Sequence, residues 1–152
     1  MSGRLTQIAL RAFDSVARLL PGRSSDPEHL QTGRRGEEEA YFHLRRQGYV
    51  IVARNYRTPR HRSELDLIGW DGEVLCFIEV KTRSARGLYP AESAVDFDKR
   101  RDLSRVARSF LRKAFLRETH AEPVYRFDIV SVYLEPGCAP DIVLFKNAFR
   151  MA

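Results

Sequence analysis

The sequence contains few of the residues that build zinc sites, disulfide scaffolds and membrane spans. Only two cysteines occur in 152 residues, Cys76 and Cys138, and they have neither C-x-x-C spacing nor a histidine pattern beside them. A structural zinc site or a disulfide framework is therefore not expected, and a reducing cytoplasm is the expected location. No apolar run approaches the roughly 20 residues that span a bilayer, so we expect no membrane partner.

Lysine is also scarce, because only four of the 26 basic residues are lysines and the other 22 are arginines. The formal net charge is +6. The planar guanidinium group matches the geometry of phosphate oxygens, so this balance favours a polyanionic partner such as nucleic acid. Against this background a lysine inside a predicted strand, Lys81, stands out.

The chain divides into three parts. Residues 1–20 place apolar side chains at i, i+3 and i+4 spacing, which predicts an amphipathic helix lying on the domain or on a protein partner. Residues 21–31 are rich in proline, glycine, serine and aspartate, and predict a linker. A compact domain is expected over residues 32–152, a length sufficient to bury a core.

Within this domain the pattern predicts a helix, three strands, a second helix and two strands. Thr32 would cap the first helix and Gly48 would stop it, and strands follow over residues 49–57, 64–70 and 73–81. Apolar residues at helical period from Leu103 to Ala114 predict the second helix, and strands follow over residues 125–134 and 141–146. The second helix carries an arginine stripe on its other side: Arg101, Arg105, Arg108 and Arg112. This order predicts an α/β fold, a mixed β-sheet flanked by helices.

The stretch SELDLIGWDGEVLCFIEVKTR, residues 63–83, inserts charged residues into two apolar strands. A two-residue turn at Asp71 and Gly72 would place residue 70 opposite 73, 68 opposite 75, 66 opposite 77 and 64 opposite 79. Since side chains alternate between faces, the charged residues would share one face and the apolar residues the other. The charged face would hold Glu64, Asp66, Glu79 and Lys81, and the apolar face Leu65, Leu67, Val74, Cys76, Ile78 and Val80.

Three carboxylates that converge on one spot need a compensating cation, and Mg²⁺ accepts carboxylate oxygens together with water. Lys81 would then orient an attacking water or neutralise charge on a phosphate. The pattern alone fits a simpler arrangement as well. The same side chains would form a cross-strand salt-bridge ladder on a solvated edge, where such pairs contribute little stability.

Several segments together resemble one bacterial family. They are TGRRGEEEA, GYVIVARNYR, SELDLIG, CFIEVKTR, VDFDKRR, RFDIVSV and the terminal NAF, and they span residues 32–149. On these segments the chain is identified as a member of the YraN family of bacterial proteins, and it resembles the PD-(D/E)XK nuclease superfamily. Within that superfamily it is similar to the archaeal Holliday-junction resolvases. The resemblance implies a restriction-endonuclease-like core over residues 32–152.

The resemblance also implies roles for single residues. Asp66, Glu79 and Glu37 would bind the metal ion, Mg²⁺ or Mn²⁺, and Lys81 would be the catalytic lysine. Glu38 would take the place of Glu37 if the first helix were rotated. Two further residues match supporting positions of the family: Glu64 before the strand, and Lys99 as a phosphate contact. The candidate nucleic-acid contacts are Arg57, Arg60, Arg62, Arg83, Arg101, Arg105, Arg108 and Arg112.

Three functions are open on this basis. The first is a metal-dependent DNA endonuclease that hydrolyses phosphodiester bonds in branched or structured DNA. The second is a non-catalytic nucleic-acid-binding protein that retains the nuclease fold. The presence of the complete set of carboxylates and the lysine argues against this second function. The third is a protein-interaction module whose partner binds residues 1–20, and it is compatible with either of the others. Junction resolvases act as two-fold dimers, so a homodimer is raised by analogy, although no residue pattern indicates an interface.

Overall fold

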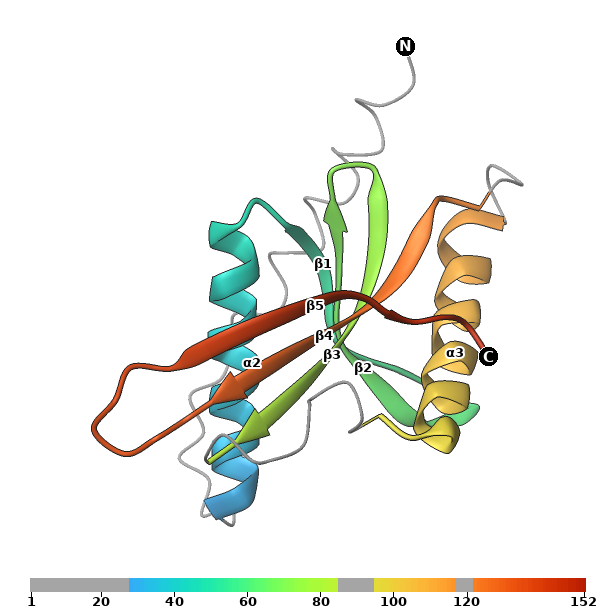
Figure 1. Ribbon diagram of the computed structural model, residues 1–152. Helices are drawn as coiled ribbons and strands as arrows, with labels where there is room; N and C mark the ends of the chain where they lie inside the picture. Colours follow the sequence, from blue (N-terminus) through green and yellow to red (C-terminus); the bar gives the residue numbers. More distant parts are fainter. Residues whose placement is uncertain (1–27, 85–94, 117–121) are drawn as a thin grey trace.

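The computed structural model describes residues 28–84, 95–116 and 122–152 (Figure 1). The predicted helix over residues 1–20 and the predicted linker up to residue 27 lie outside the described residues. The described elements are α2 (Glu28–Arg46), β1 (Val50–Thr58), β2 (His61–Asp71), β3 (Val74–Arg83), α3 (Phe97–Leu111), a π-helical turn (Arg112–Leu116), β4 (Tyr125–Tyr133) and β5 (Asp141–Phe149).

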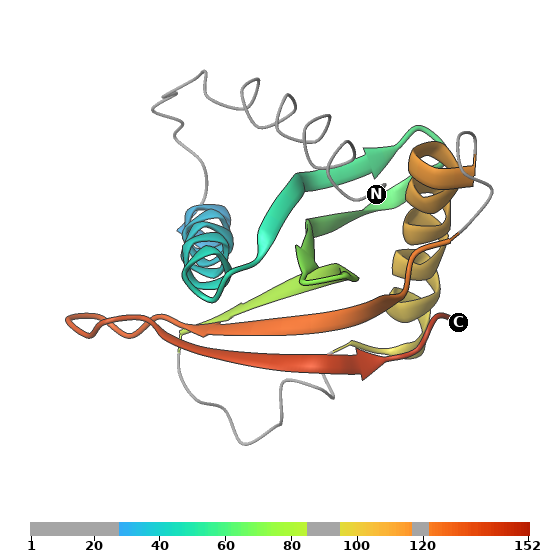
Figure 2. The same cartoon turned by 90° about the horizontal axis from the view of Figure 1, so that it is seen from above.

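The five strands form one sheet in the order β1-β2-β3-β4-β5. β3 and β4 run parallel, and the other neighbouring strands run antiparallel. A parallel step needs a crossover connection, and α3 lies between β3 and β4 in the chain. The sheet is therefore mixed, and with α2 on one side and α3 on the other it confirms the predicted α/β fold (Figure 2).

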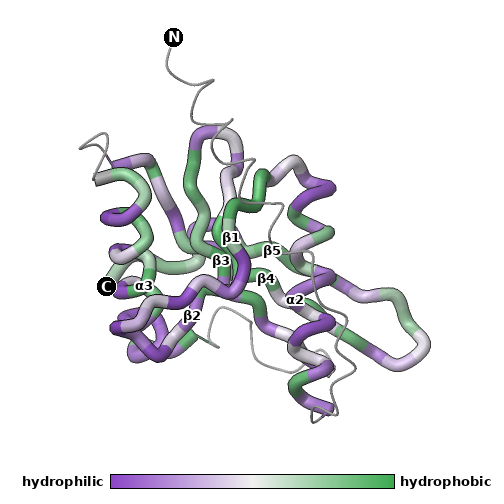
Figure 3. Tube along the Cα trace, turned by 180° about the vertical axis from the view of Figure 1, so that it is seen from behind, coloured by the Kyte–Doolittle hydropathy of each residue, from purple (hydrophilic) through white to green (hydrophobic). Residues whose placement is uncertain are grey.

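Two apolar clusters cover the two faces of the sheet. Along β3, Leu75 and Phe77 belong to the cluster beneath α3, whereas Cys76 and Ile78 belong to the cluster beneath α2. Hydrophobic residues accordingly concentrate along the central strands (Figure 3). One face assignment is wrong: Leu65 packs in the α3 cluster and not with Cys76 and Ile78, because β2 is no longer paired with β3 at that residue.

α2 begins earlier than predicted and ends as predicted. It begins at Glu28, and Thr32 lies inside it, where the hydroxyl of Thr32 donates a 2.9 Å hydrogen bond to the carbonyl of Glu28. Thr32 is therefore not the cap, and the last residues of the predicted linker are helical. The helix ends at Arg46, and Gly48 follows with φ of 92°, the left-handed conformation that commonly ends helices.

α3 begins after Asp96, whose carboxylate accepts a 2.8 Å hydrogen bond from the backbone N–H of Lys99. The helix buries Leu103 and Leu111, and the arginine stripe on its other side is exposed, as predicted. Two of the stripe's members are partly neutralised by acids of the same helix, Arg101 by Asp98 at 3.0 Å and Arg105 by Asp102 at 3.3 Å.

The predicted register of the β2–β3 hairpin is wrong, because the two-residue turn lies one residue further along the chain than predicted. Asp71 pairs with Val74, so the turn consists of Gly72 and Glu73, with Gly72 at φ of 61°. Asp71 stays in the strand because Arg126 of β4 and Lys146 of β5 bind its carboxylate there. Each residue is paired with one two positions further along the partner strand than predicted. Within the paired stretch, residues 67–71 and 74–78, the side chains therefore keep their predicted faces although they change partners.

Residues 58–63, which lie between the first two predicted strands, are mostly strand. β1 continues to Thr58 and β2 starts at His61, so only Pro59 and Arg60 form the turn. Arg57 and Arg62 therefore project from the paired strands of a hairpin, which fixes their spacing more firmly than a loop would.

Candidate functional site at the fork between β2 and β3

The site lies where β2 and β3 separate. Their pairing runs from Asp71↔Val74 to Leu67↔Ile78, and beyond that point β2 pairs with β1 and β3 pairs with β4. Asp66 and Glu79 are the first residues past the last pair. The two strands diverge from there toward the lower part of Figure 1, and we call this place the fork. The backbone N–H of Val80 donates a 2.7 Å hydrogen bond to Oδ2 of Asp66 across it.

Glu79 is buried at the fork between two lysines. Its side chain is 5% exposed, and its Oε1 lies 3.0 Å from Nζ of Lys81 and 3.3 Å from Nζ of Lys99. Lys81 comes from the same strand face, and Lys99 comes from the first turn of α3. Oε2 of Glu79 is buried and has no hydrogen-bond partner. This geometry differs from a solvated cross-strand ladder, because β3 is the central strand and its carboxylate is inside the protein.

Asp66 is electrostatically unfavourable as a carboxylate in this place. Burial, and next the charge of Glu79, raise the pKa of Asp66 to about 8, and Glu37 adds to the rise. The hydrogen bond from Val80 and the charge of Lys99 oppose it. A group whose charge costs this much in the folded state is typical of a site that receives a cation or handles protons.

Glu37 approaches the fork from α2. Oε2 of Glu37 accepts a 2.9 Å hydrogen bond from Nδ2 of Asn55 in β1, and the register places Asn55 opposite Asp66. Gly36 allows the approach, since a Cβ on this residue would lie 1.8 Å from Oγ1 of Thr82 in β3. The first helix therefore brings Glu37 to the fork, whereas Glu38 is exposed.

Sequence reasoning missed Asn55. The residue has φ of 48° within a strand, a left-handed conformation that asparagine tolerates better than most residues. An asparagine in the middle of the β-branched and aromatic run VIVARNYR was the available signal, because asparagine is depleted in regular strands.

Other predicted site residues lie apart from this group. Glu64 binds Nε of Arg57 across the β1–β2 ladder and does not take its predicted position opposite Glu79. Arg83 follows Lys81 on β3, where its Nε is buried and has no hydrogen-bond partner. Arg60 is exposed at the tip of the β1–β2 hairpin.

Whether the carboxylates suit a metal ion depends on how many ligands the protein must supply. Among residues 28–84, 95–116 and 122–152, no group of three or more histidine, cysteine, aspartate or glutamate side chains is placed to hold one. Asp66, Glu79 and Glu37 thus do not stand as one preformed cluster. Mg²⁺ is commonly held by only one or two carboxylates, with water and substrate phosphate completing its shell. Asp66 and Glu79 are two such carboxylates that interact electrostatically, and Oε2 of Glu79, which has no hydrogen-bond partner, would be available as a hard oxygen ligand.

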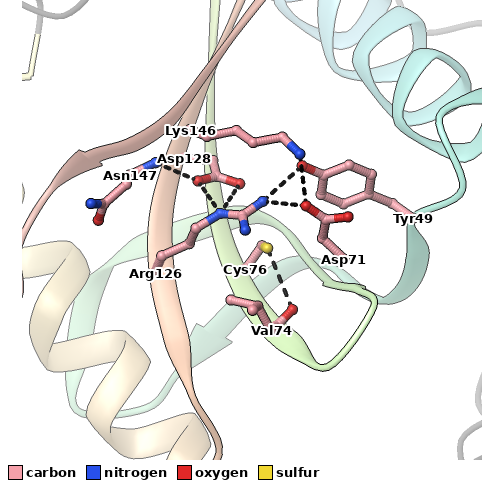
Figure 4. A network of polar contacts seen from close by, with 8 residues as sticks. All are labelled: Tyr49, Asp71, Val74, Cys76, Arg126, Asp128, Lys146 and Asn147. Carbon is pink, nitrogen blue, oxygen red and sulfur yellow. Dashed lines mark hydrogen bonds and ion pairs between the residues drawn. The ribbon is translucent and has the colours of Figure 1, made fainter.

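A second polar network lies at the closed end of the β2–β3 hairpin (Figure 4). Arg126 donates through Nε to Asp128 at 2.9 Å and through Nη2 to Asp71 at 2.6 Å and to the hydroxyl of Tyr49 at 3.0 Å. Nζ of Lys146 lies 2.8 Å from the same oxygen of Asp71. Hydrogen bonds from Arg126 and Lys146 lower the pKa of Asp71 to about 2.

This network fixes strands around a buried centre. Asp128 is fully buried, and it also accepts a 2.8 Å hydrogen bond from the backbone N–H of Asn147, close to the irregularity in β4–β5 pairing. The network joins β2, β4 and β5, so it holds the hairpin in the observed register. We assign it a structural role.

The chain is similar to proteins of one family. A sequence profile described as the uncharacterised protein family UPF0102 matches residues 36–132. A UPF0102 protein of Koribacter versatilis is 55% identical over 147 residues, which cover 97% of this chain and 96% of the relative. UPF0102 proteins of Solibacter usitatus and Pelobacter propionicus are 48% and 38% identical, over 77% and 87% of this chain and 84% and 91% of the relatives. In the part of the chain that the structure describes, no helix has the length and apolar character needed to cross a membrane.

Proposed function

The chain belongs to the uncharacterised protein family UPF0102, the YraN family of the sequence resemblance, and from this premise we propose that it is a metal-dependent DNA endonuclease. The observation that carries the proposal is that two carboxylates, Asp66 and the buried Glu79, lie together at the fork beside Lys81. The proposed reaction is hydrolysis of a phosphodiester bond, in branched or otherwise structured DNA.

Asp66 and Glu79 would hold Mg²⁺ or Mn²⁺, and Glu37 would contact the ion through water while it remains bonded to Asn55. The ion, when bound, supplies stabilisation of the negative charge that develops on the phosphate. A cation at this place also relieves the repulsion that raises the pKa of Asp66. The cost of keeping these acids inside the protein is thereby offset by ligand binding.

The two lysines that share Oε1 of Glu79 have separable roles. Lys99 would keep Glu79 neutralised from the first turn of α3. Lys81 would then leave this oxygen to orient the attacking water or to donate to a phosphate oxygen. A single lysine could not do both, because its departure would leave a buried carboxylate uncompensated.

Arginines on the surface would bind the DNA backbone without reading its sequence. Arg57, Arg60 and Arg62 of the β1–β2 hairpin belong to this group, with Arg83. The α3 stripe contributes less than four full charges, because Asp98 and Asp102 pair with two of its members.

The proposal is tested by incubating the purified protein with linear duplex, single-stranded and four-way-junction DNA in Mg²⁺, Mn²⁺ or EDTA. We expect cleavage only with the metal, and a loss of at least about 100-fold in Asp66→Asn, Glu79→Gln and Lys81→Met. Lys146→Ala is the control, since Lys146 is exposed and lies at the closed end of the hairpin.

Two outcomes contradict the proposal. Binding to DNA with no cleavage of any substrate in either metal would favour the non-catalytic nucleic-acid-binding protein. Cleavage that persists at full rate in the three variants would place the active site elsewhere. Thermal unfolding of each variant separates a lost function from a lost fold.

A further inference from the structure

An arginine and aromatic surface lies on the α2 side of the fork, outside every group assigned above. Its members are Tyr41, Phe42 and Arg45 of α2 and Arg54 of β1, and we call it the α2–β1 patch. The guanidinium carbon of Arg54 lies 4.6 Å from the centre of the Tyr41 ring, and that of Arg45 lies 5.8 Å from it. Nη1 of Arg45 also donates to the hydroxyl of Tyr41 at 3.2 Å.

Phe42 is the exposed member of the patch. Its ring packs edge-on against Tyr41 with the centroids 5.3 Å apart, yet 49% of the residue is exposed. An exposed phenylalanine held by a neighbouring ring keeps a flat apolar surface in solvent at little cost in side-chain entropy. Such a surface accepts a planar apolar group.

Two residues of the patch are close in the chain to residues at the fork. Tyr41 lies four residues after Glu37, hence on the same side of α2. Arg54 directly precedes Asn55, which donates to Glu37 and lies opposite Asp66. A strand of nucleic acid whose phosphate is at the fork would therefore have the patch beside it along α2 and β1.

From this arrangement we propose that the α2–β1 patch binds an unpaired strand of the nucleic-acid substrate, with one base stacked on Phe42 and phosphates bound by Arg54 and Arg45. The inference rests on the proposed function for the identity of the ligand, and it adds that the substrate has unpaired bases. Bases inside a duplex are stacked on one another and do not offer a free face, whereas every unpaired base does.

Charge disfavours two other occupants of the patch. A second copy that docked through the same surface would bring its own two arginines against Arg45 and Arg54, which like charges disfavour. Residues 1–20 carry Arg4, Arg11 and Arg18 against the single acid Asp14, so this segment is also basic. A polyanion matches the patch and neither alternative does.

The test measures binding without cleavage. Full-length protein in EDTA is titrated into a fluorescent oligothymidylate of about 20 nucleotides and into a duplex of equal length, at two salt concentrations. We expect Phe42→Ala to weaken binding of the single strand by on the order of tenfold and to change duplex binding less than about twofold. Phe42→Trp, which keeps a stacking face, should restore the affinity.

Arg54→Gln should lower the salt dependence of single-strand binding by about one counterion, as expected for loss of one phosphate contact. Val124→Ala is the matched control for an exposed apolar residue, since Val124 is 71% exposed outside the patch. It should leave both affinities unchanged.

Three results would overturn the inference. The first is unchanged single-strand affinity in Phe42→Ala, and the second is an equal loss for single strand and duplex. The third is a change in oligomeric mass of Phe42→Ala without a change in affinity, which would make the patch an interface between copies. Because the assay contains no metal, its outcome is independent of whether the protein cleaves DNA.

Discussion

Asp66 accepts a hydrogen bond from the backbone N–H of Val80, 2.7 Å from its Oδ2, at the place where β2 and β3 cease to pair. The carboxylate takes the position of a strand carbonyl, so the strands separate without leaving this buried N–H unsatisfied. One side chain therefore maintains the fork and belongs to the candidate site. An asparagine in its place keeps an oxygen acceptor and removes the charge.

The free energy of unfolding should depend on pH through Asp66. Its folded-state pKa of about 8 exceeds the ordinary value of 3.8, so the folded protein retains a proton that the unfolded chain releases. This group therefore lowers stability progressively as pH rises from about 4 to about 8. Without metal, Asp66→Asn should be more stable than the natural protein by on the order of 2 kcal/mol at pH 8, and by less at pH 5. Urea unfolding in EDTA at both pH values measures the difference, and a difference independent of pH would contradict the assignment.

Either lysine beside Glu79 should be sufficient to stabilise the buried carboxylate when the other is removed. Lys81→Met or Lys99→Met alone leaves one ammonium group on Oε1, and should cost about 1 kcal/mol or less at pH 7. The double variant leaves a buried carboxylate without a cation and should cost about 3 to 5 kcal/mol. Adding Glu79→Gln to the double variant should recover most of this loss. Strictly additive single effects in chemical unfolding would show that the lysines do not share one partner.

Gly36 and Gly33 offer a matched pair in one helix. A Cβ on Gly36 would lie 1.8 Å from Oγ1 of Thr82, whereas nothing lies within 4 Å of a Cβ on Gly33. Gly36→Ala should destabilise the protein by about 1 to 3 kcal/mol and move α2 away from β3, while Gly33→Ala should stabilise it by about 0.5 to 1 kcal/mol. Thr82→Ala should partly rescue Gly36→Ala, because it removes two of the three close atoms. Equal thermal midpoints for the two glycine variants would refute the close packing.

Arg126 and Lys146 bind the same oxygen of Asp71 but should contribute unequally. Arg126 is mostly buried and also neutralises the fully buried Asp128, whereas Lys146 is 51% exposed. Arg126→Ala should cost about 3 to 5 kcal/mol, and Lys146→Ala less than about 1 kcal/mol.

Asp71 stabilises the fold above pH 4, and this contribution should be lost as pH falls from about 4 to about 2. Denaturant titrations at pH 7 and pH 3 test both expectations. Equal losses of stability in the two variants would contradict the first, and an unchanged contribution of Asp71 at pH 3 would contradict the second.

Much of the fold follows from local sequence patterns. The two helices within the described residues, the five strands and the order that implies a mixed sheet are each set by periodicities of a few residues. Local patterns define the helix boundaries less well. α2 extends back to Glu28, and Thr32, a good cap by residue type, instead donates its hydroxyl hydrogen bond to the preceding turn of the helix.

The hairpin register is set by long-range contacts and not by the local turn preference. Asp71-Gly72 is a strong turn signal by itself, but two cations from β4 and β5 hold Asp71 in the strand. No pattern within the hairpin contains that information, because Arg126 and Lys146 are more than fifty residues away in the chain.

The sequence by itself determined which residues could form the site. Alternation along a strand places Glu79 and Lys81 on one face whatever the register, and a register change of two leaves this unaltered. Only the tertiary structure decided that Lys99 shares Glu79 with Lys81, that Asn55 holds Glu37 beside the fork, and that Glu64 turns to Arg57. The reason is physical: a face is fixed by the covalent geometry of neighbouring residues, whereas a partner is fixed by how closely distant elements pack, here by the absence of a side chain at Gly36.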